Sequence, residues 1–166
     1  QLDTTFSFND FKIQVANLLV TDGFFETQNN SLIPESSLSI FKLNSDKNIV
    51  RLLKSLSKDL SILRPNMFFS GLQVIKHNLN RQVDRVKIFE YGKIYLSEKR
   101  GFLEKEKLTI YSCGMFQGES WNEDNRPVDF FFMKGVFDKI LDLYQIDHSN
   151  LSMLEKEYDY KKDHPI

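Results

Sequence analysis

Apolar residues recur with the period of an α-helix in three parts of the chain. The first part ends before Gly23, places its apolar side chains on one face, and is preceded by a suitable N-cap, Ser7. The second follows Pro65, a residue favoured in the first turn of a helix. The third begins at Asp129, and Gly135 inside it predicts the close approach of another element. The apolar positions of the three predicted helices are Phe8, Phe11, Val15, Leu18 and Leu19; Phe68, Leu72, Ile75 and Leu79; and Phe130, Met133, Val136 or Phe137, Ile140, Leu141 and Tyr144.

Runs of β-branched and aromatic residues separate and follow the helices and are typical of strands. One run has a polar middle, Thr27 to Asn30. Another run is interrupted by Gly92, so that run forms one bent strand or two short strands. The run at 108–115 has apolar groups on both faces, which favours a central strand. The predicted strands lie at residues 24–33, 48–53, 87–96, 108–115 and 151–160. Hairpin-forming strands between helices predict an α+β fold with a mainly antiparallel sheet flanked by helices, which we expect to cover one face.

The charge balance argues against an autonomous nucleic-acid-binding module. The 166 residues carry 22 basic and 23 acidic side chains, a net charge of −1, whereas an autonomous nucleic-acid-binding module usually has a basic excess. We see no secretory signal and no apolar run long enough to span a membrane. The single cysteine, Cys113, suits a reducing compartment. We therefore expect a cytoplasmic protein without a membrane partner. From its ends we expect residues 1–166 to be one domain of a longer chain, truncated at its C-terminal end.

Few residues are candidates for chemistry. The three histidines match no zinc-ligand spacing, and the chain has none of the common phosphate-binding or nucleophile motifs. Glu90 is either a buried functional carboxylate or, more often in such a position, a strand residue paired with a cation or a backbone donor. Trp121 is either a binding aromatic or a loop anchor beside the helix that follows it. The residues alone therefore predict no catalytic, cofactor-binding or metal site.

Short motifs occur along the chain in a recognisable order. They are DGFFE at 22–26, RP at 64–65, NLNR at 78–81, FEYGKIY at 89–95 and, after Trp121, VDFF at 128–131 with KG at 134–135. In this order, and over residues 11–144, they resemble the catalytic-core-like domain of the phenylalanyl-tRNA synthetase β chain. The residues that carry the resemblance as candidate motif or structural positions are Arg64, Asn80, Arg81, Glu90, Gly92 and Trp121.

The resemblance implies a degenerate class-II aminoacyl-tRNA synthetase fold. The family's holoenzyme, with two α and two β chains, joins phenylalanine to its tRNA using ATP and magnesium, and its active site belongs to the α chain. This domain would then be a noncatalytic scaffold that packs against the α chain, holds no cofactor itself and meets tRNA only through the holoenzyme. By the same resemblance, the first helix would supply a subunit interface; the alternative is that it simply packs on its own sheet. The interface candidates are Phe8, Phe11, Val15 and Leu18.

Two other functions stay open at this point: a free-standing class-II synthetase-like enzyme and an unrelated α+β protein-interaction domain. An active enzyme of this class needs an arginine that holds the α-phosphate of ATP, where negative charge develops. Alignment on Gly92 and Tyr95 puts Leu96 at that position. Lys54 and Ser55 also stand where the family has asparagine and proline. The missing arginine favours the noncatalytic scaffold.

Overall fold

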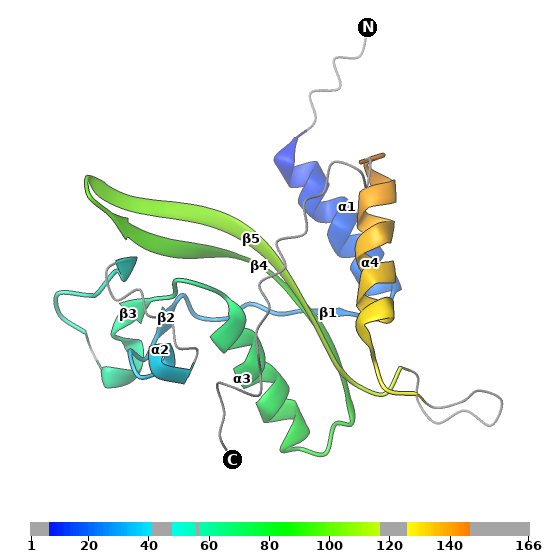
Figure 1. Cartoon of the computed structure of the whole chain (residues 1–166), viewed down its shortest axis with the longest axis horizontal. Coiled ribbons are helices and arrows are strands. Elements are labelled where there is room, and N and C mark those ends of the chain that lie inside the picture. The colour runs from blue at the N-terminus through cyan, green and yellow to red at the C-terminus, as the bar shows by residue number, and fades with distance from the viewer. Residues whose placement is uncertain (1–6, 41–47, 56, 117–125, 147–166) are drawn as a thin grey trace, which may run out of the picture.

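The larger sheet has three strands and a helix layer on each face. The computed structural model describes residues 7–40, 48–55, 57–116 and 126–146. The strand order is β1 (Phe25–Glu26), β4 (Arg85–Glu98), β5 (Gly101–Gly114). Helices α1 (Phe8–Thr21) and α4 (Phe130–Leu143) lie side by side, and α3 (Phe68–Leu79) lies apart from them (Figure 1).

A long hairpin forms the body of this sheet. β4 and β5 pair antiparallel from Arg85 opposite Gly114 to Glu98 opposite Gly101, so the interruption expected at Gly92 leaves one continuous strand. β1 joins the other side of β4 in a parallel register. The predicted α+β fold with a mainly antiparallel sheet is confirmed. The central position expected for the strand at 108–115 is wrong within the described residues, because β4 is central and β5 lies at the edge.

Consecutive residues of β4 bury their side chains on opposite faces of the sheet. Phe89 points to the side of α1 and α4, where it packs with Val15, Leu19, Phe24, Val136 and Ile140. Glu90 points to the other side, toward the segment that precedes α3. Both residues are buried, which requires cover on both faces. The expectation that helices cover only one face is therefore wrong.

The helix ends confirm three of the sequence signals. The Oγ of Ser7 accepts a hydrogen bond from the backbone N of Asn9 at 3.2 Å, and Gly23 has a φ of 83° just after the C-cap of α1. In α4, Oδ1 of Asp129 accepts from the N of Phe132 at 2.8 Å. The expectation for Gly135 is wrong among the described residues, because a Cβ added there would meet nothing within 4 Å.

α3 forms where the sequence predicts a helix but buries another face. Phe69, Ser70 and Gly71 are the buried residues, whereas Phe68 and Leu72 of the predicted stripe are exposed. The reason is the ring of Tyr111 on β5, which packs so closely on Gly71 that a Cβ there would overlap it. The hydroxyl of Tyr111 also donates to the carbonyl of Met67 at 3.0 Å. The face of α3 that meets the sheet is the one that carries Gly71, which has no side chain, and not the face with the predicted apolar stripe.

A second, smaller sheet lies beside the hairpin. β2 (Leu32–Ile33) pairs antiparallel with β3 (Ile62–Leu63), next to the short helices α2 (Ser37–Ile40) and η2 (Lys58–Leu60). The strand predicted at 24–33 is therefore two short strands with the polar middle between them. The strand predicted at 48–53 is reduced to an isolated bridge between Arg51 and Ile62. The strand predicted at 151–160 lies outside the described residues.

Tyr91 buries a hydroxyl in the main core. Its ring meets Phe89 edge-on at 6.2 Å between centroids, and its oxygen has no hydrogen-bond partner within the described residues. Burial, with smaller contributions from Tyr144 and Glu26, raises the pKa of Tyr91 to about 12. Because the folded state holds the phenol neutral, stability is fully present below the ordinary pKa of 10.0 and declines as pH rises toward about 12.

We expect Tyr91→Phe and Tyr111→Phe to change stability in opposite directions. Tyr91→Phe removes a buried hydroxyl that lacks a partner and should raise the free energy of unfolding by up to about 1 kcal/mol. Tyr111→Phe removes the bond to the Met67 carbonyl and should lower it by about 1 kcal/mol. Urea unfolding at neutral pH measures both, and Tyr91→Phe should also flatten the alkaline loss of stability. Equal destabilisation by the two variants would contradict the burial of an unpartnered Tyr91 hydroxyl.

Candidate functional site

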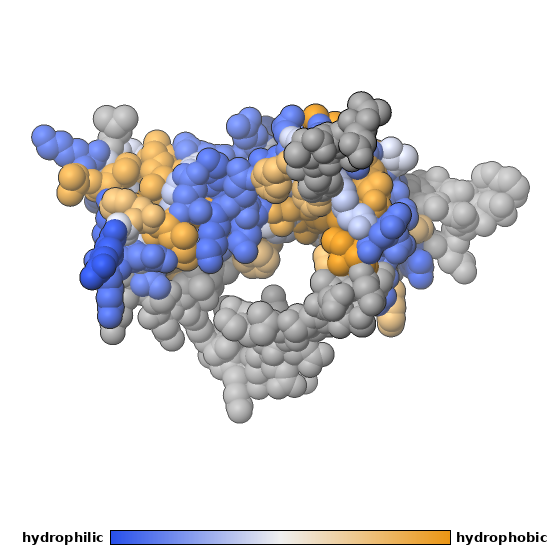
Figure 2. All heavy atoms as spheres, turned by 90° about the horizontal axis from the view of Figure 1, so that it is seen from above, coloured by the Kyte–Doolittle hydropathy of each residue, from blue (hydrophilic) through white to orange (hydrophobic). Residues whose placement is uncertain are grey.

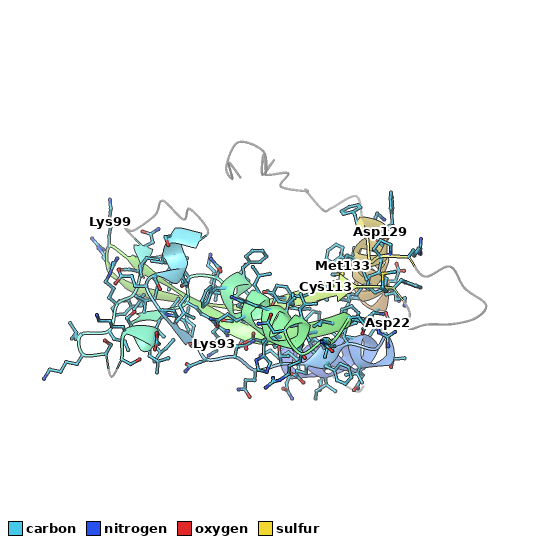
Figure 3. The ribbon with its side chains drawn as sticks, turned by 90° about the horizontal axis from the view of Figure 1, so that it is seen from below. Asp22, Lys93, Lys99, Cys113, Asp129 and Met133 are labelled. Carbon is cyan, nitrogen blue, oxygen red and sulfur yellow. The ribbon has the colours of Figure 1, made fainter. Side chains whose placement is uncertain are left out.

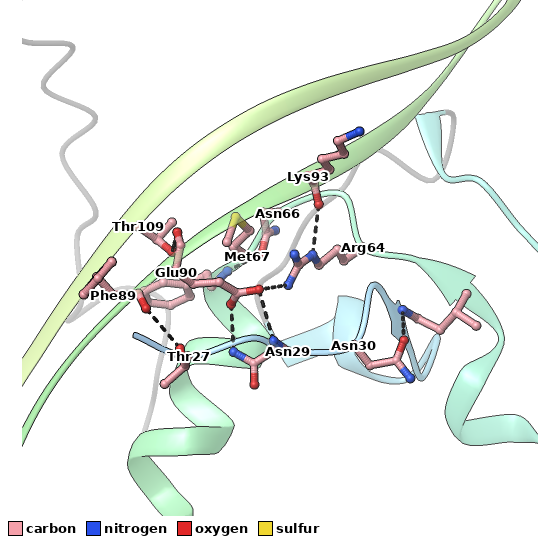
Figure 4. Close-up of polar contacts among 12 residues, drawn as sticks. Thr27, Asn29, Asn30, Arg64, Asn66, Met67, Phe89, Glu90, Lys93 and Thr109 are labelled. Atoms are coloured by element: carbon pink, nitrogen blue, oxygen red, sulfur yellow. Dashed lines mark hydrogen bonds and ion pairs between the residues drawn. The ribbon is translucent and has the colours of Figure 1, made fainter. Parts of the chain in front are cut away.

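The most buried charged groups of the described chain are the side chains of Arg64 and Glu90. Nη1 of Arg64 lies 2.8 Å from Oε1 of Glu90, and the two residues are only 2% and 1% exposed (Figure 4). Arg64 lies between β3 and α3, and Glu90 lies in the middle of β4. Burying two charges carries a desolvation cost of several kcal/mol per ion, which is offset only when the remaining hydrogen-bonding groups also find partners.

Those partners come from two further places in the chain. Asn29 donates twice to Glu90, from its backbone N to Oε1 at 3.2 Å and from Nδ2 to Oε2 at 2.7 Å. Nε of Arg64 donates to the carbonyl of Lys93 at 2.9 Å. Both carboxylate oxygens of Glu90 are therefore occupied. This buried cluster of Asn29, Arg64, Glu90 and the Lys93 carbonyl neutralises its own charge.

Backbone bonds tie the same segments together around the cluster. The N of Arg64 donates to the carbonyl of Ser31 at 2.9 Å, and the N of Tyr95 donates to the carbonyl of Arg64 at 3.0 Å. The N of Thr27 donates to the carbonyl of Phe89 at 2.8 Å. The β1–β2 connection, the β3–α3 connection and β4 are thus held in one arrangement.

Gly92 provides the space that the arginine occupies. Glu90 and Gly92 are two residues apart on a strand, so they face the same side of the sheet. A Cβ at Gly92 would overlap Nη2 of Arg64 and stand 2.6 Å from Cε of Met67. The spacing of glutamate and glycine in FEYG therefore combines a carboxylate with room for its guanidinium partner.

The structure brings together three of the six candidate motif residues. Arg64, Glu90 and Gly92 meet in the buried cluster, whereas Asn80 and Arg81 are exposed at the C-terminal end of α3 and Trp121 lies outside the described residues. For Glu90, the interpretation as a paired strand residue is the one that the contacts support. Sequence reasoning missed Asn29, although the polar middle of residues 27–30 was the available signal.

The four interface candidates on α1 differ in what they expose. Val15 is 0% exposed and belongs to the core of this chain, so it has no free surface for another chain in this arrangement. Phe11 and Leu18 are partly buried against the same core. Phe8 is 54% exposed. Of the four, Phe8 therefore offers the largest apolar surface.

A second charged group, Lys87, is surrounded by aromatic rings on the α4 side of the sheet. Its Nζ lies 4.7 Å from the ring centroid of Phe132 and within 6 Å of those of Phe24 and Phe116. Burial, and next the charge of Arg85, lower the pKa of Lys87. Figure 3 shows Asp22, Asp129 and Met133 near α1 and α4, Lys99 at the opposite end of the molecule, and Lys93 between them. The ammonium of Lys87 joins β4 to the start of α4 rather than standing free.

The described residues contain no group of three or more histidine, cysteine, aspartate or glutamate side chains that could hold a metal ion. Within the same residues, no helix has the length and apolar character needed to cross a membrane. The buried cluster has no unused charge to present to a ligand. Its geometry supports a structural role, which is to hold the β1–β2 connection and the β3–α3 connection against β4.

Comparison with known proteins identifies relatives over most of the chain. The family described as "Phenylalanyl tRNA synthetase beta chain CLM domain" matches residues 4–165. Phenylalanine–tRNA ligase beta subunits are 30% identical over 136 residues in Burkholderia lata, 31% over 130 in Thermotoga maritima and 32% over 136 in Porphyromonas gingivalis. These matches cover 76%, 78% and 76% of this chain but only 17%, 16% and 17% of the relatives. The chain therefore spans about a sixth of their length.

Solved structures share the fold. A pyrrolysyl-tRNA synthetase from Desulfitobacterium hafniense matches with a TM-score of 0.59 at 19% identity, over 85% of this chain and 46% of that one. A second structure of that organism's pyrrolysyl-tRNA synthetase matches with a TM-score of 0.51 at 24% identity, over 64% of this chain and 39% of that one. The predicted class-II synthetase-like fold is thereby confirmed.

We expect single changes in the buried pair to cost more stability than a double change. Glu90→Leu or Arg64→Met leaves one buried charge without its partner and should lower the free energy of unfolding by about 3–5 kcal/mol. The double variant Arg64→Met/Glu90→Leu removes both charges and should lose less than either single variant. A double-mutant cycle in urea measures the difference. Additive losses would show that the two side chains do not act as a pair.

Gly92→Ala and Gly135→Ala form a matched pair of glycine substitutions. At Gly92 the added methyl would displace Arg64, so we expect a loss of stability of at least about 2 kcal/mol. At Gly135, which is exposed inside α4, the methyl meets nothing within 4 Å, and the higher helix propensity of alanine should add about 0.5–1 kcal/mol. Thermal unfolding distinguishes the two. A tolerated Gly92→Ala would contradict the close packing of the guanidinium on β4.

Proposed function

Because this chain belongs to the phenylalanyl-tRNA synthetase β-chain family, we propose that it is a noncatalytic scaffold domain of a phenylalanine–tRNA ligase. The holoenzyme would attach phenylalanine to its tRNA with ATP and magnesium bound in the α chain, and this domain would meet tRNA only as part of that assembly. The observation that carries the proposal is the buried pair of Arg64 and Glu90. Two charged residues of the motifs, Arg64 and Glu90, neutralise each other inside the fold instead of facing a substrate.

The position expected to hold the α-phosphate of ATP supports the same conclusion. Leu96 occupies it, partly buried on β4 opposite Leu103 of β5. A leucine supplies neither a charge nor a hydrogen-bond donor, and preorganised donors are usually the largest single contribution to catalysis. Lys93, the nearest cation before it on the strand, is paired with Glu104. The alternative of a free-standing synthetase-like enzyme gains no support from these residues.

The outward faces of α1 and α4 are suited to contact another chain. Figure 2 shows hydrophobic residues at the end of the molecule that carries these helices and at the opposite end, with a hydrophilic area between them. The apolar residues exposed on α1 are Phe8, Ile13 and Val20, and those on α4 are Phe130, Phe131, Phe137 and Leu143. Scattered apolar residues are ordinary on a surface, whereas a large contiguous apolar patch marks an interaction site. We propose the α chain as the partner, in an assembly of two α and two β chains.

We expect no ATP–pyrophosphate exchange from this chain with any amino acid, because it lacks the cation that the reaction needs. Leu96→Arg should not restore it, since one contact does not rebuild a site that lacks its other parts. The assay combines the purified chain with ATP, magnesium, labelled pyrophosphate and each amino acid in turn. Exchange that survives repurification and is abolished by Glu90→Gln in a folded sample would favour the free-standing enzyme instead.

We expect Ile13→Asp and Val15→Asp to separate the interface from the core. Ile13 is exposed, so Ile13→Asp should leave the circular dichroism unchanged while reducing co-purification with the α chain at least about tenfold. Val15 is fully buried, and a carboxylate there should unfold the domain at a cost of several kcal/mol. Asn17→Asp, on an exposed polar position of α1, is the matched control for added charge. Normal assembly of both Ile13→Asp and Phe8→Asp would contradict the interface.

A further inference from the structure

A pocket of about 380 Å³ opens on the side of the sheet that faces α3, between the start of that helix and the hairpin. Its apolar walls come from Met67, Phe68, Ile94 and Tyr111. Two polar side chains with spare hydrogen-bonding groups, Asn66 and Lys107, also line it. The proposed scaffold role makes no use of this pocket, which lies across the sheet from the exposed faces of α1 and α4.

The hydrogen bonds around the pocket leave donors on Asn66 and Lys107 available to a ligand. Oδ1 of Asn66 already accepts from the N of Phe68 at 3.0 Å, so its NH₂ group is the part left to bind a ligand. The hydroxyl of Tyr111 donates to the Met67 carbonyl, and burial raises the pKa of that phenol, which keeps the donor proton in place. The ammonium of Lys107 makes no ion pair with any described residue.

The surroundings of the pocket do not oppose an anion. Thr109, another lining residue, donates its hydroxyl to the backbone carbonyl of Glu90 at 3.5 Å, so the Glu90 backbone is directly behind the wall. The carboxylate of Glu90 is neutralised by Arg64 and saturated by Asn29. The two acids nearest Lys107 in sequence, Glu104 and Glu106, are paired with Lys93 and Lys12. Lys107 is therefore the uncompensated charge at this site.

We propose that this pocket binds a small apolar carboxylate. The apolar body would lie against Phe68, Ile94 and Tyr111, and the carboxylate would accept hydrogen bonds from Lys107 and Asn66. An ammonium group beside the carboxylate would lie close to the like charge of Lys107, so the pocket should discriminate against zwitterions. The same chemistry is offered by a free acid and by the C-terminal carboxylate of a peptide that ends in an apolar residue.

A series of probes that differ only at the polar end tests the proposal. The full chain, labelled with ¹⁵N, is titrated with 3-phenylpropionate, 3-phenylpropanol and L-phenylalanine, and amide shifts are followed. We expect 3-phenylpropionate to bind with a dissociation constant on the order of 1 mM, a usual strength for so small a ligand, and to shift residues 66–68, 94 and 107–111. The alcohol and the zwitterion should bind at least threefold more weakly. Equal affinities for all three probes, or shifts confined to other residues, would overturn the proposal.

Two further arms separate the source of the carboxylate and the role of the lysine. N-acetyl-glycyl-phenylalanine, compared with its C-terminal amide, tests a peptide terminus, and tighter binding than the free acid assigns the pocket to peptides.

Lys107→Gln should weaken the binding of 3-phenylpropionate about three- to fivefold, as expected for one exposed charge, with Lys105→Gln as the matched control on the same strand. An equal effect of the two variants would refute the assigned contact. Co-purification of Lys107→Gln with the α chain should be unchanged, which keeps this test independent of the scaffold role.

Discussion

The arrangement of this domain depends on the burial of Arg64 against Glu90. An arginine and a glutamate almost free of solvent are tolerated only if nearly every donor and acceptor around them is used. That requirement fixes the position of Asn29, which supplies two donors, and of the Lys93 carbonyl, which accepts one. It also excludes a side chain at Gly92. One ion pair thereby sets the geometry of two connections, β1–β2 and β3–α3, around the central strand.

The two faces of the sheet bury different kinds of residue. On one face, Phe89 and the buried residues of α1 and α4 form an apolar core, and both helices also expose apolar residues. On the other face, the polar cluster holds the start of α3 in place, and the pocket with Lys107 opens next to it. The fold is shared with class-II synthetases. The carboxylate of Glu90 on the central strand holds neighbouring segments of the chain in place.

The local features of the chain agree with the structure where neighbouring residues decide the outcome. Ser7, Gly23 and Asp129 act at helix ends through contacts within three residues, so a short window of sequence contains all the necessary information. The hairpin is similar, because β4 and β5 follow each other directly. Asn29 shows the opposite case. It lies 61 residues from Glu90, and a polar stretch in a predicted strand indicates that something unusual is present without indicating its partner.

The sequence by itself determined the three helices, the hairpin, the α+β class and, through the order of its motifs, the family. Only the tertiary structure decided which face of α3 is buried, that β1 runs parallel to β4, and that Val15 belongs to the core while Phe8 does not. The physical reason is that periodicity indicates which face of a helix is apolar, whereas burial depends on the shape of the residues that pack against the helix. The Tyr111 ring selects the side of α3 that carries Gly71. No pattern within the helix contains that contact.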